Sequence, residues 1–335
     1  MESMNIKNRE KGRVGRIISF IFSFLFLAVA IWVVLNRQLV VDQITVWQFQ
    51  PSSQISQLAS DSGMNDTGRF LYYASRPELN DRSNFNQNCT TRETQSIVLG
   101  CYVDNRIYLF DVTDDRISGI RSVVAAHEML HAAYQRLSDS ERSTINKMLE
   151  QQLSETKDKN ILDTVEIYNR IEPGEKLNEL HSLFATETQN LSPDLENYYR
   201  KYFSDRGKVI EIYQKYSQVF NDLETKAANL QKNLKSQKSN IDKLTANYES
   251  QQKTLISDIS SFNERAKSVG GFASQSVFDE ARKDLVDRQN SLKTMTVKIN
   301  GLINEYNSSV NDLNALGIEI AKLNENLKST DQQIR

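Results

Sequence analysis

The chain contains a five-residue segment whose spacing is typical of a zinc site, His127-Glu128-Met129-Leu130-His131. Only three histidines occur among 335 residues, and two of them stand in this segment. Residues four apart on a helix share one face, so the two imidazoles could bind one tetrahedral Zn²⁺. Glu128 is then placed to take a proton from a water that attacks a carbonyl. The segment predicts zinc-dependent hydrolysis; the alternative is a core helix with two buried histidines and a paired glutamate.

The residues around this segment predict the helix that the chemistry requires. Small and apolar side chains precede and follow the two histidines at helical spacing, with Glu128 as the only charged residue among them. Ser138 and Glu141 have the spacing of a capping box, which begins a following helix.

A catalytic zinc site has three protein ligands and leaves a fourth position to water. Segment 177–187 follows the breaker pair Pro173-Gly174, has helical periodicity and offers two carboxylates, Glu179 and Glu187. Glu187 falls in the apolar stripe, so we expect it to be buried and paired, to zinc or to a ligand imidazole. The segment is the expected source of the third ligand.

The His-Glu-x-x-His helix and the pair Asn178-Glu179 resemble those of zincin metallopeptidases of the gluzincin type, in which a glutamate is the third zinc ligand. The resemblance is to bacterial membrane-anchored enzymes and covers about residues 100–206. It implies a hydrolase with Zn²⁺ held by His127, His131 and Glu179, and with Glu128 as general base. Glu187 is the rival ligand or the partner of a ligand histidine.

The sequence differs from the motifs of two zincin families. Metzincins place a third histidine six residues after the second, with a glycine between them, whereas Tyr134 and Leu137 occupy the equivalent positions here. Metzincins are therefore excluded. The acidic residue usual in gluzincins four positions after the ligand glutamate is replaced by Leu183.

Two residues are candidates for donating a hydrogen bond to a reacting oxyanion. His181 is the third histidine, but on a helix it lies about 160° away from Glu179 at roughly 100° per residue, which favours a structural or exposed position. Tyr168 is the alternative donor.

The start of the chain predicts a membrane anchor. Residues 1–16 carry five basic side chains, and residues 17–35 contain Ser19 and Ser23 as their only polar side chains. Such a helix spans a bilayer, and the positive residues predict a cytoplasmic N-terminus with the remainder outside the membrane. A cleaved signal peptide ending near Ala28-Val29-Ala30 is the alternative; the apolar run that continues to Leu35 favours a retained anchor.

Cys89 and Cys101 are the only cysteines. Outside the cytoplasm a pair this close is expected to form a disulfide, and neither the spacing nor a nearby histidine supports a zinc role.

Residues 43–206 are expected to form an α+β, zincin-like and mostly helical catalytic domain. Alternation in residues 43–49 predicts a strand. Residues 107–112 predict another strand, either one that forms the upper edge of the cleft, along which a peptide could pair, or an internal strand of a small sheet.

Residues 208–335 predict a long antiparallel coiled-coil hairpin. Apolar residues recur every seven positions from Phe220 to Phe262 and again from Leu285 to Leu327, and a Gly-Gly pair lies between the arms, which places the turn near 269–274. The core is interrupted by polar residues, namely Gln237, Gln251, Asp258, Arg288 and Ser309. The hairpin is either a spacer or oligomerisation arm, or a docking arm for a protein partner.

The sequence thus predicts a single-pass membrane metallopeptidase that acts on a peptide or protein outside the cytoplasmic membrane. The alternative is a non-enzymatic envelope scaffold or adaptor built on a zinc-stapled domain and the coiled coil. A net charge of −2 gives no basic surface for nucleic acid.

Overall fold

The computed structural model describes residues 3–89 and 98–329, with side chains from Ser19 onward. The chain is mostly helical with a small sheet. It divides into two compact units, Met1–Ser217 with Asn326–Arg335, and Gln218–Glu325. The second unit holds most of the predicted hairpin.

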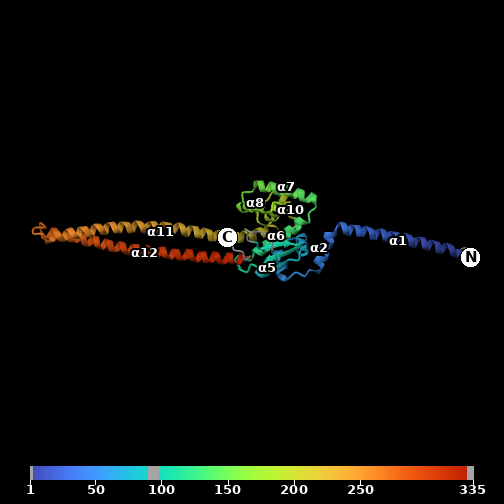
Figure 1. Cartoon of the computed structure of the whole chain (residues 1–335), viewed down its shortest axis with the longest axis horizontal. Helices are drawn as coiled ribbons and strands as arrows, with labels where there is room; N and C mark the ends of the chain where they lie inside the picture. Colours follow the sequence, from blue (N-terminus) through green and yellow to red (C-terminus); the bar gives the residue numbers. More distant parts are fainter. Residues whose placement is uncertain (1–2, 90–97, 330–335) are drawn as a thin grey trace. The chain divides into compact units, whose positions relative to one another are not determined.

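The helices before the hairpin lie in the first unit (Figure 1). Their bounds are α1 Ser3–Leu35, α2 Arg37–Gln48, α3 Ser53–Asp61, α4 Asp66–Ala74, α5 Arg82–Asn88, α6 Ile120–Gln135, α7 Asp139–Glu155, α8 Lys159–Ile171, α9 Lys176–Thr186 and α10 Pro193–Tyr199. Several begin at the caps that the sequence provides. Ser138 and Glu141 form the expected capping box of α7, and Ser192 caps α10 with Pro193 at its first turn.

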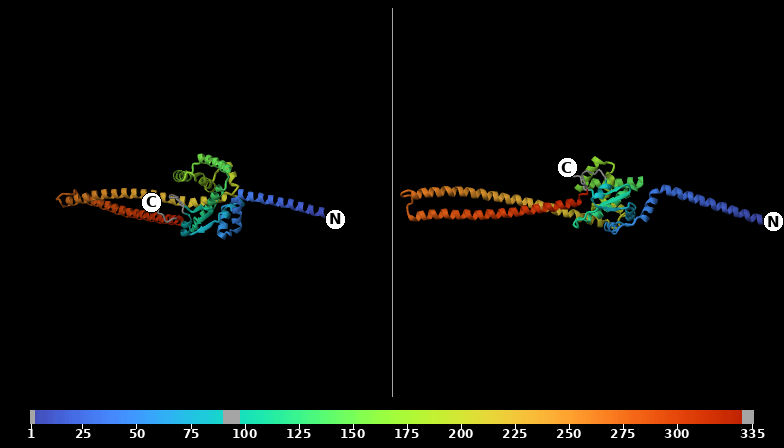
Figure 2. Two further views of the ribbon diagram at one scale, coloured as in Figure 1. Left: turned by 45° about the vertical axis from the view of Figure 1, so that its right-hand side comes forward. Right: turned by 60° about the horizontal axis from the view of Figure 1, so that its bottom comes forward.

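The described strands form one three-stranded sheet in the order β1-β3-β2 (Figure 2). Strand β1 (Glu78–Asn80) is parallel to β3 (Arg106–Phe110), and β2 (Gly100–Val103) is antiparallel to β3. Asp104 and Asn105 join β2 to β3 with φ of 50° and 60°, the left-handed backbone of a tight hairpin turn. The strand expected at 107–112 is therefore central among the described strands, and the outer strand that contacts α6 is β2.

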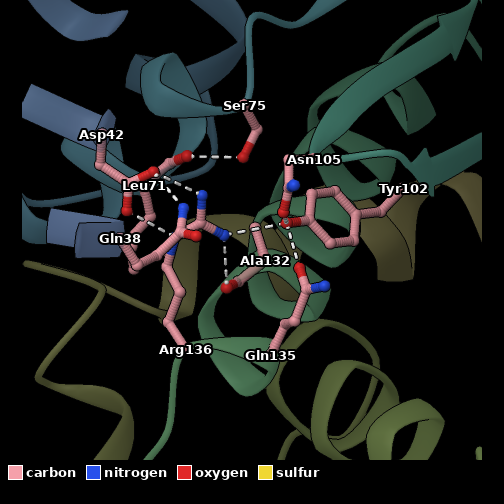
Figure 3. A network of polar contacts seen from close by, with 9 residues as sticks. All are labelled: Gln38, Asp42, Leu71, Ser75, Tyr102, Asn105, Ala132, Gln135 and Arg136. Atoms are coloured by element: carbon pink, nitrogen blue, oxygen red, sulfur yellow. Dashed lines mark hydrogen bonds and ion pairs between the residues drawn. The ribbon is translucent and has the colours of Figure 1, made fainter. Parts of the chain in front are cut away.

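The strand predicted for residues 43–49 is wrong, because this segment belongs to helix α2. None of the described strands pairs with this segment, and helical spacing lets Gln38 donate to Asp42 at 2.9 Å. The same geometry buries Asp42 and Thr45 on one face. Asp42 then accepts two hydrogen bonds from Arg136, the residue that follows the end of α6 (Figure 3).

Helix α6 lies at the centre of the first unit, in contact with α3, α4, α9 and the sheet. It buries most of its residues, including Val123, Ala126, Met129, Leu130 and Ala133. Helix α9 buries every residue from Leu180 to Thr186 and packs on α6. Two buried helices in direct contact can hold polar side chains of their shared face in a fixed geometry.

Cys89 and Cys101 are joined by a disulfide bond, with Cα atoms 5.9 Å apart. The bond ties the end of α5 to strand β2, which contacts α6.

Helix α1 contains the apolar stretch predicted to cross the membrane. Over the residues whose side chains are described, no single helix is long and apolar enough to span a bilayer. Ser19–Leu35 and Arg37–Gln48, bent by 86° with respect to each other, meet that test together in length and composition.

Helices α11 (Gly207–Lys267) and α12 (Gln275–Leu327) run side by side as the two arms of the hairpin, with the turn between them at residues 268–274 (Figures 1 and 2). The arms are held near the turn by the rings of Phe262, Phe272 and Phe278, whose centroids lie 5.2–5.3 Å apart. Two of the predicted polar interruptions, Asp258 and Arg288, face each other across the arms in an ion pair of 2.8 Å.

Candidate metal centre

His127, His131 and Glu179 come together from two helices. The histidines lie one turn apart on α6, and Glu179 lies on the first turn of α9. His127 Nε2 is 3.5 Å from Glu179 Oε1, and His131 Nε2 is 3.5 Å from Glu179 Oε2. One donor atom of each residue lies within 4.8 Å of the others, and all three side chains are largely buried.

This donor set fits a zinc ion. Zinc prefers imidazole nitrogen and carboxylate oxygen, and ligand atoms at about 2.1 Å from a tetrahedral ion lie about 3.4 Å from one another. The two imidazole-to-carboxylate distances of 3.5 Å, each to a different oxygen of Glu179, are close to that spacing, and one donor atom of each of the three residues lies within 4.8 Å of the others. The three side chains therefore have the chemical types and the proximity of a zinc site, and they would have to move closer together around the ion.

Neighbouring polar groups orient the ligands. His131 Nδ1 lies 3.0 Å from Asn178 Oδ1, and the amide of Asn178 is itself fixed by a 2.9 Å bond from its Nδ2 to Glu175. Because the Asn178 oxygen can only accept, His131 carries its proton on Nδ1 and leaves Nε2 free for a metal. Tyr168 donates to Glu179 Oε2 at 3.1 Å. The hydroxyl of Tyr168, which the sequence offered as a donor to a reacting oxyanion, therefore donates to the candidate ligand Glu179.

The electrostatics of the three groups follow from their burial and proximity. Burial lowers the pKa of His127, but the charge of Glu179, with Glu128 and Glu187, outweighs burial and raises it to about 9. Burial raises the pKa of Glu179, while His127, His131 and Tyr168 together lower it to about 2. Burial and the charge of His127 hold the pKa of His131 below its ordinary value. Without a metal, Glu179 is an anion that attracts a proton to His127; a divalent cation would take that proton's place.

Glu128 is buried and lines the same pocket as the three candidate ligands. Gly100, the first residue of β2, lies against it: a Cβ at Gly100 would be 2.6 Å from Glu128 Oε1 and 2.4 Å from Val124 Cγ1. Strand β2 therefore approaches the candidate general base more closely than any side chain at position 100 would allow.

The pocket at this centre has a volume of about 370 Å³. One wall is the segment from Val98 to Tyr102, and the others come from α6, α8, α9 and the first turns of α11. The sequence did not predict that Tyr213 and Tyr216 line this pocket, because all residues from 208 onward were expected to belong to the coiled-coil hairpin. Both tyrosines precede Phe220, the first residue of the heptad repeat, and this position could have indicated that they pack on the catalytic domain.

Glu187 lines this pocket but lies outside the group of three. It is the C-cap residue of α9, one residue beyond the helix end, so it does not continue the helical face that carries Glu179. Burial raises its pKa to about 7, against an opposing contribution from Tyr213. The structure thus places Glu179, and not Glu187, between the two histidines.

His181 is fully buried and has a structural environment. Its Nε2 lies 3.0 Å from the hydroxyl of Tyr198, and the rings of Tyr134, Tyr199 and Tyr202 surround it. It does not line the pocket of the candidate metal centre.

No protein-family model, curated protein or solved structure matched the chain in comparisons with known proteins.

Proposed function

We propose that this chain is a membrane-anchored zinc metallopeptidase of the gluzincin type. The observation that carries the proposal is the convergence of His127, His131 and Glu179 within 4.8 Å, in a pocket that also contains Glu128. A purely structural zinc site has no need for a carboxylate in the position of a general base, whereas a hydrolytic site does.

The roles of the residues follow from their types and positions. Zn²⁺ held by His127, His131 and Glu179 would supply Lewis-acid chemistry toward a carbonyl and toward water. Glu128 would accept a proton from the attacking water on a carboxylate oxygen and deliver it to the nitrogen of the leaving amine. Asn178 and Tyr168 would keep His131 and Glu179 in position through the hydrogen bonds described above.

Strand β2 supports a peptide as the substrate class. It is an outer strand among the described strands, and its residues line the same pocket as Glu128. An extended peptide could add to its free edge through main-chain hydrogen bonds. This pairing would place a scissile amide beside the candidate base.

The proposed location is the outer side of the cytoplasmic membrane. It is supported by the basic residues that precede the apolar stretch of 17–35 and by the disulfide between Cys89 and Cys101, because disulfides persist in oxidising compartments. The hairpin of α11 and α12 would serve as a spacer or as a docking arm for a protein partner.

The test uses the full chain purified in detergent and loaded with zinc. We expect about one zinc per chain, and cleavage of an unfolded protein substrate that Glu128→Gln reduces by about 10²-fold or more with its zinc retained. Glu150→Gln, which removes one exposed carboxylate of α7, is the matched control and should cleave like the wild type. Zinc binding without Glu128-dependent cleavage would favour the alternative, a non-enzymatic scaffold.

A further inference from the structure

A carboxylate and two tyrosine rings that have no part in the group of three also line this pocket. Glu187 follows the end of α9, and Tyr213 lies on the first turns of α11, close enough to affect the pKa of the Glu187 carboxyl. Tyr216 lies one turn further along α11, with its ring centroid 6.4 Å from that of Tyr213. All three residues line the pocket that contains His127 and Glu128.

Apart from His127, His131 and the metal ion that they would hold, the charged side chains of this pocket are acidic. Its described lining residues include five glutamates and neither lysine nor arginine. Glu128 and Glu179 are assigned to the reaction and to the metal, and Glu175 is bound to Asn178. Glu187 is neither the candidate base nor a candidate metal ligand, and it is not bound to Asn178. Its principal charged neighbours are His127, Glu179 and Asp158, of which two are anions.

The Glu187 side chain is half-buried where it lines the pocket, and burial raises its pKa to about 7, so its charged form is costly without a cation beside it. An apolar substrate side chain would not reduce the cost of ionising Glu187. An acidic side chain would be repelled by its carboxylate. A guanidinium or ammonium group would pair with the carboxylate and could lie against the faces of Tyr213 and Tyr216. The site is therefore complementary to a cationic side chain.

We propose that Glu187, Tyr213 and Tyr216 form a specificity subsite that takes an arginine or lysine side chain of the substrate peptide, next to the cleaved bond. This inference rests on the proposed peptidase function and names its substrate class. It also gives Glu187 a role other than metal binding.

The test uses quenched fluorescent peptides of mixed sequence in which one position is fixed as arginine, lysine, citrulline or norleucine. At one position near the cleaved bond, the zinc-loaded full chain should cleave the arginine or lysine series with kcat/KM about tenfold above the neutral series. Glu187→Gln should reduce this ratio to about twofold or less, because the amide keeps the shape and removes the charge. Tyr216→Leu should reduce it to an intermediate value.

Zinc content and circular dichroism identify any variant that fails to fold, and Glu150→Gln should keep the wild-type ratio. A wild type that cleaves all four series equally, or a ratio that survives Glu187→Gln in a folded protein, overturns the subsite and leaves the peptidase function standing.

Peptide binding tests the subsite in a variant that does not cleave the peptide. Fluorescence anisotropy with Glu128→Gln as the parent protein should show the arginine peptides binding about tenfold more tightly than the citrulline peptides, and the double variant Glu128→Gln/Glu187→Gln should lose this difference. If the wild type cleaves no peptide and this difference is still present, the peptidase function fails while the cation subsite stands. If the difference is absent, the subsite is wrong.

Discussion

Arg136 and Asp42 form a two-point ion pair, with Nε–Oδ2 and Nη2–Oδ1 both at 2.8 Å, that joins the end of helix α6 to helix α2. Both side chains are almost completely buried. Arg136 also donates to the hydroxyl of Tyr102 on β2 at 2.9 Å (Figure 3). One guanidinium thus connects the helix with the candidate histidines to the segment after α1 and to the strand that borders the pocket.

Removing this guanidinium should destabilise the first unit. Arg136→Met leaves the carboxylate of Asp42 buried without a cation, which costs about 3–5 kcal/mol, whereas the double variant Arg136→Met/Asp42→Leu should recover most of the loss. Thermal unfolding followed by near-ultraviolet circular dichroism measures both, because the packed tyrosines of this unit give the signal. Equal losses in the single and double variants would contradict a cost that arises from the unpaired charge.

The prediction that residues 43–49 form a strand failed for a reason that this ion pair explains. Alternation over seven residues fits a short strand as well as one face of a helix. The helix that forms instead brings Asp42 into contact with Arg136, 94 positions later in the chain. No local pattern contains that information.

Features with a local signal were predicted better. The helix around His127 and His131, the capping box of α7 and the turn of the hairpin all depend on residues within a few positions of one another. Within the centre, the third ligand required a choice between Glu179 and Glu187, because a pattern gives the face of a helix but not where the helix ends. The structure ends α9 at Thr186, places Glu187 at its C-cap and leaves Glu179 in the group with the two histidines.

The hydrogen bond from His131 to Asn178 predicts an effect on metal affinity. Asn178→Leu removes the acceptor that fixes the imidazole tautomer, so zinc affinity should fall by about 10–100-fold. Asn178→Asp keeps an acceptor and should bind zinc at least as tightly as the wild type. Competition with a chromophoric chelator measures both constants. Unchanged affinity in the leucine variant would show that Asn178 does not orient the ligand.

Gly100 should be intolerant of the smallest side chain. A Cβ there would lie 2.9 Å from Glu128 Cγ and closer still to its Oε1, so Gly100→Ala must displace strand β2 or the candidate base. A displacement of about 1 Å can reduce turnover by about 10²-fold, and zinc content should not change. Gly174→Ala is the matched control, because a Cβ at that position meets nothing within 4 Å. Full activity of Gly100→Ala would exclude Glu128 as a precisely positioned base.

Substitution of the two candidate glutamates should have different effects on the zinc content of the protein. His127→Ala and Glu179→Ala each remove a ligand from the group of three and should lower bound zinc sharply after dialysis against a weak chelator. Glu187→Ala removes a pocket carboxylate outside that group and should retain zinc at close to one equivalent. Loss of the metal in Glu187→Ala alone, with Glu179→Ala still loaded, would reverse the assignment.

His181 should make the metal-free protein sensitive to acid. Burial, with the charges of His131 and His127, lowers its pKa to about 3, and its Nε2 faces the hydroxyl of Tyr198. A neutral histidine in the folded state and a basic one in the unfolded state mean that its contribution to stability is complete above pH 6.5 and is lost as the pH falls toward about 3.

The loss attributable to His181 should approach about 1.4 kcal/mol per pH unit below pH 6. His181→Gln keeps a polar group opposite Tyr198 but cannot take up a proton, so its free energy of unfolding should change less between pH 7 and pH 4.5 than that of the wild type. Urea unfolding at four pH values, on protein treated with a chelator so that ligand protonation is common to both, gives the two slopes. If the free energy of unfolding changed equally with pH in the two proteins, the tyrosines that surround His181 would have to move apart before His181 is protonated.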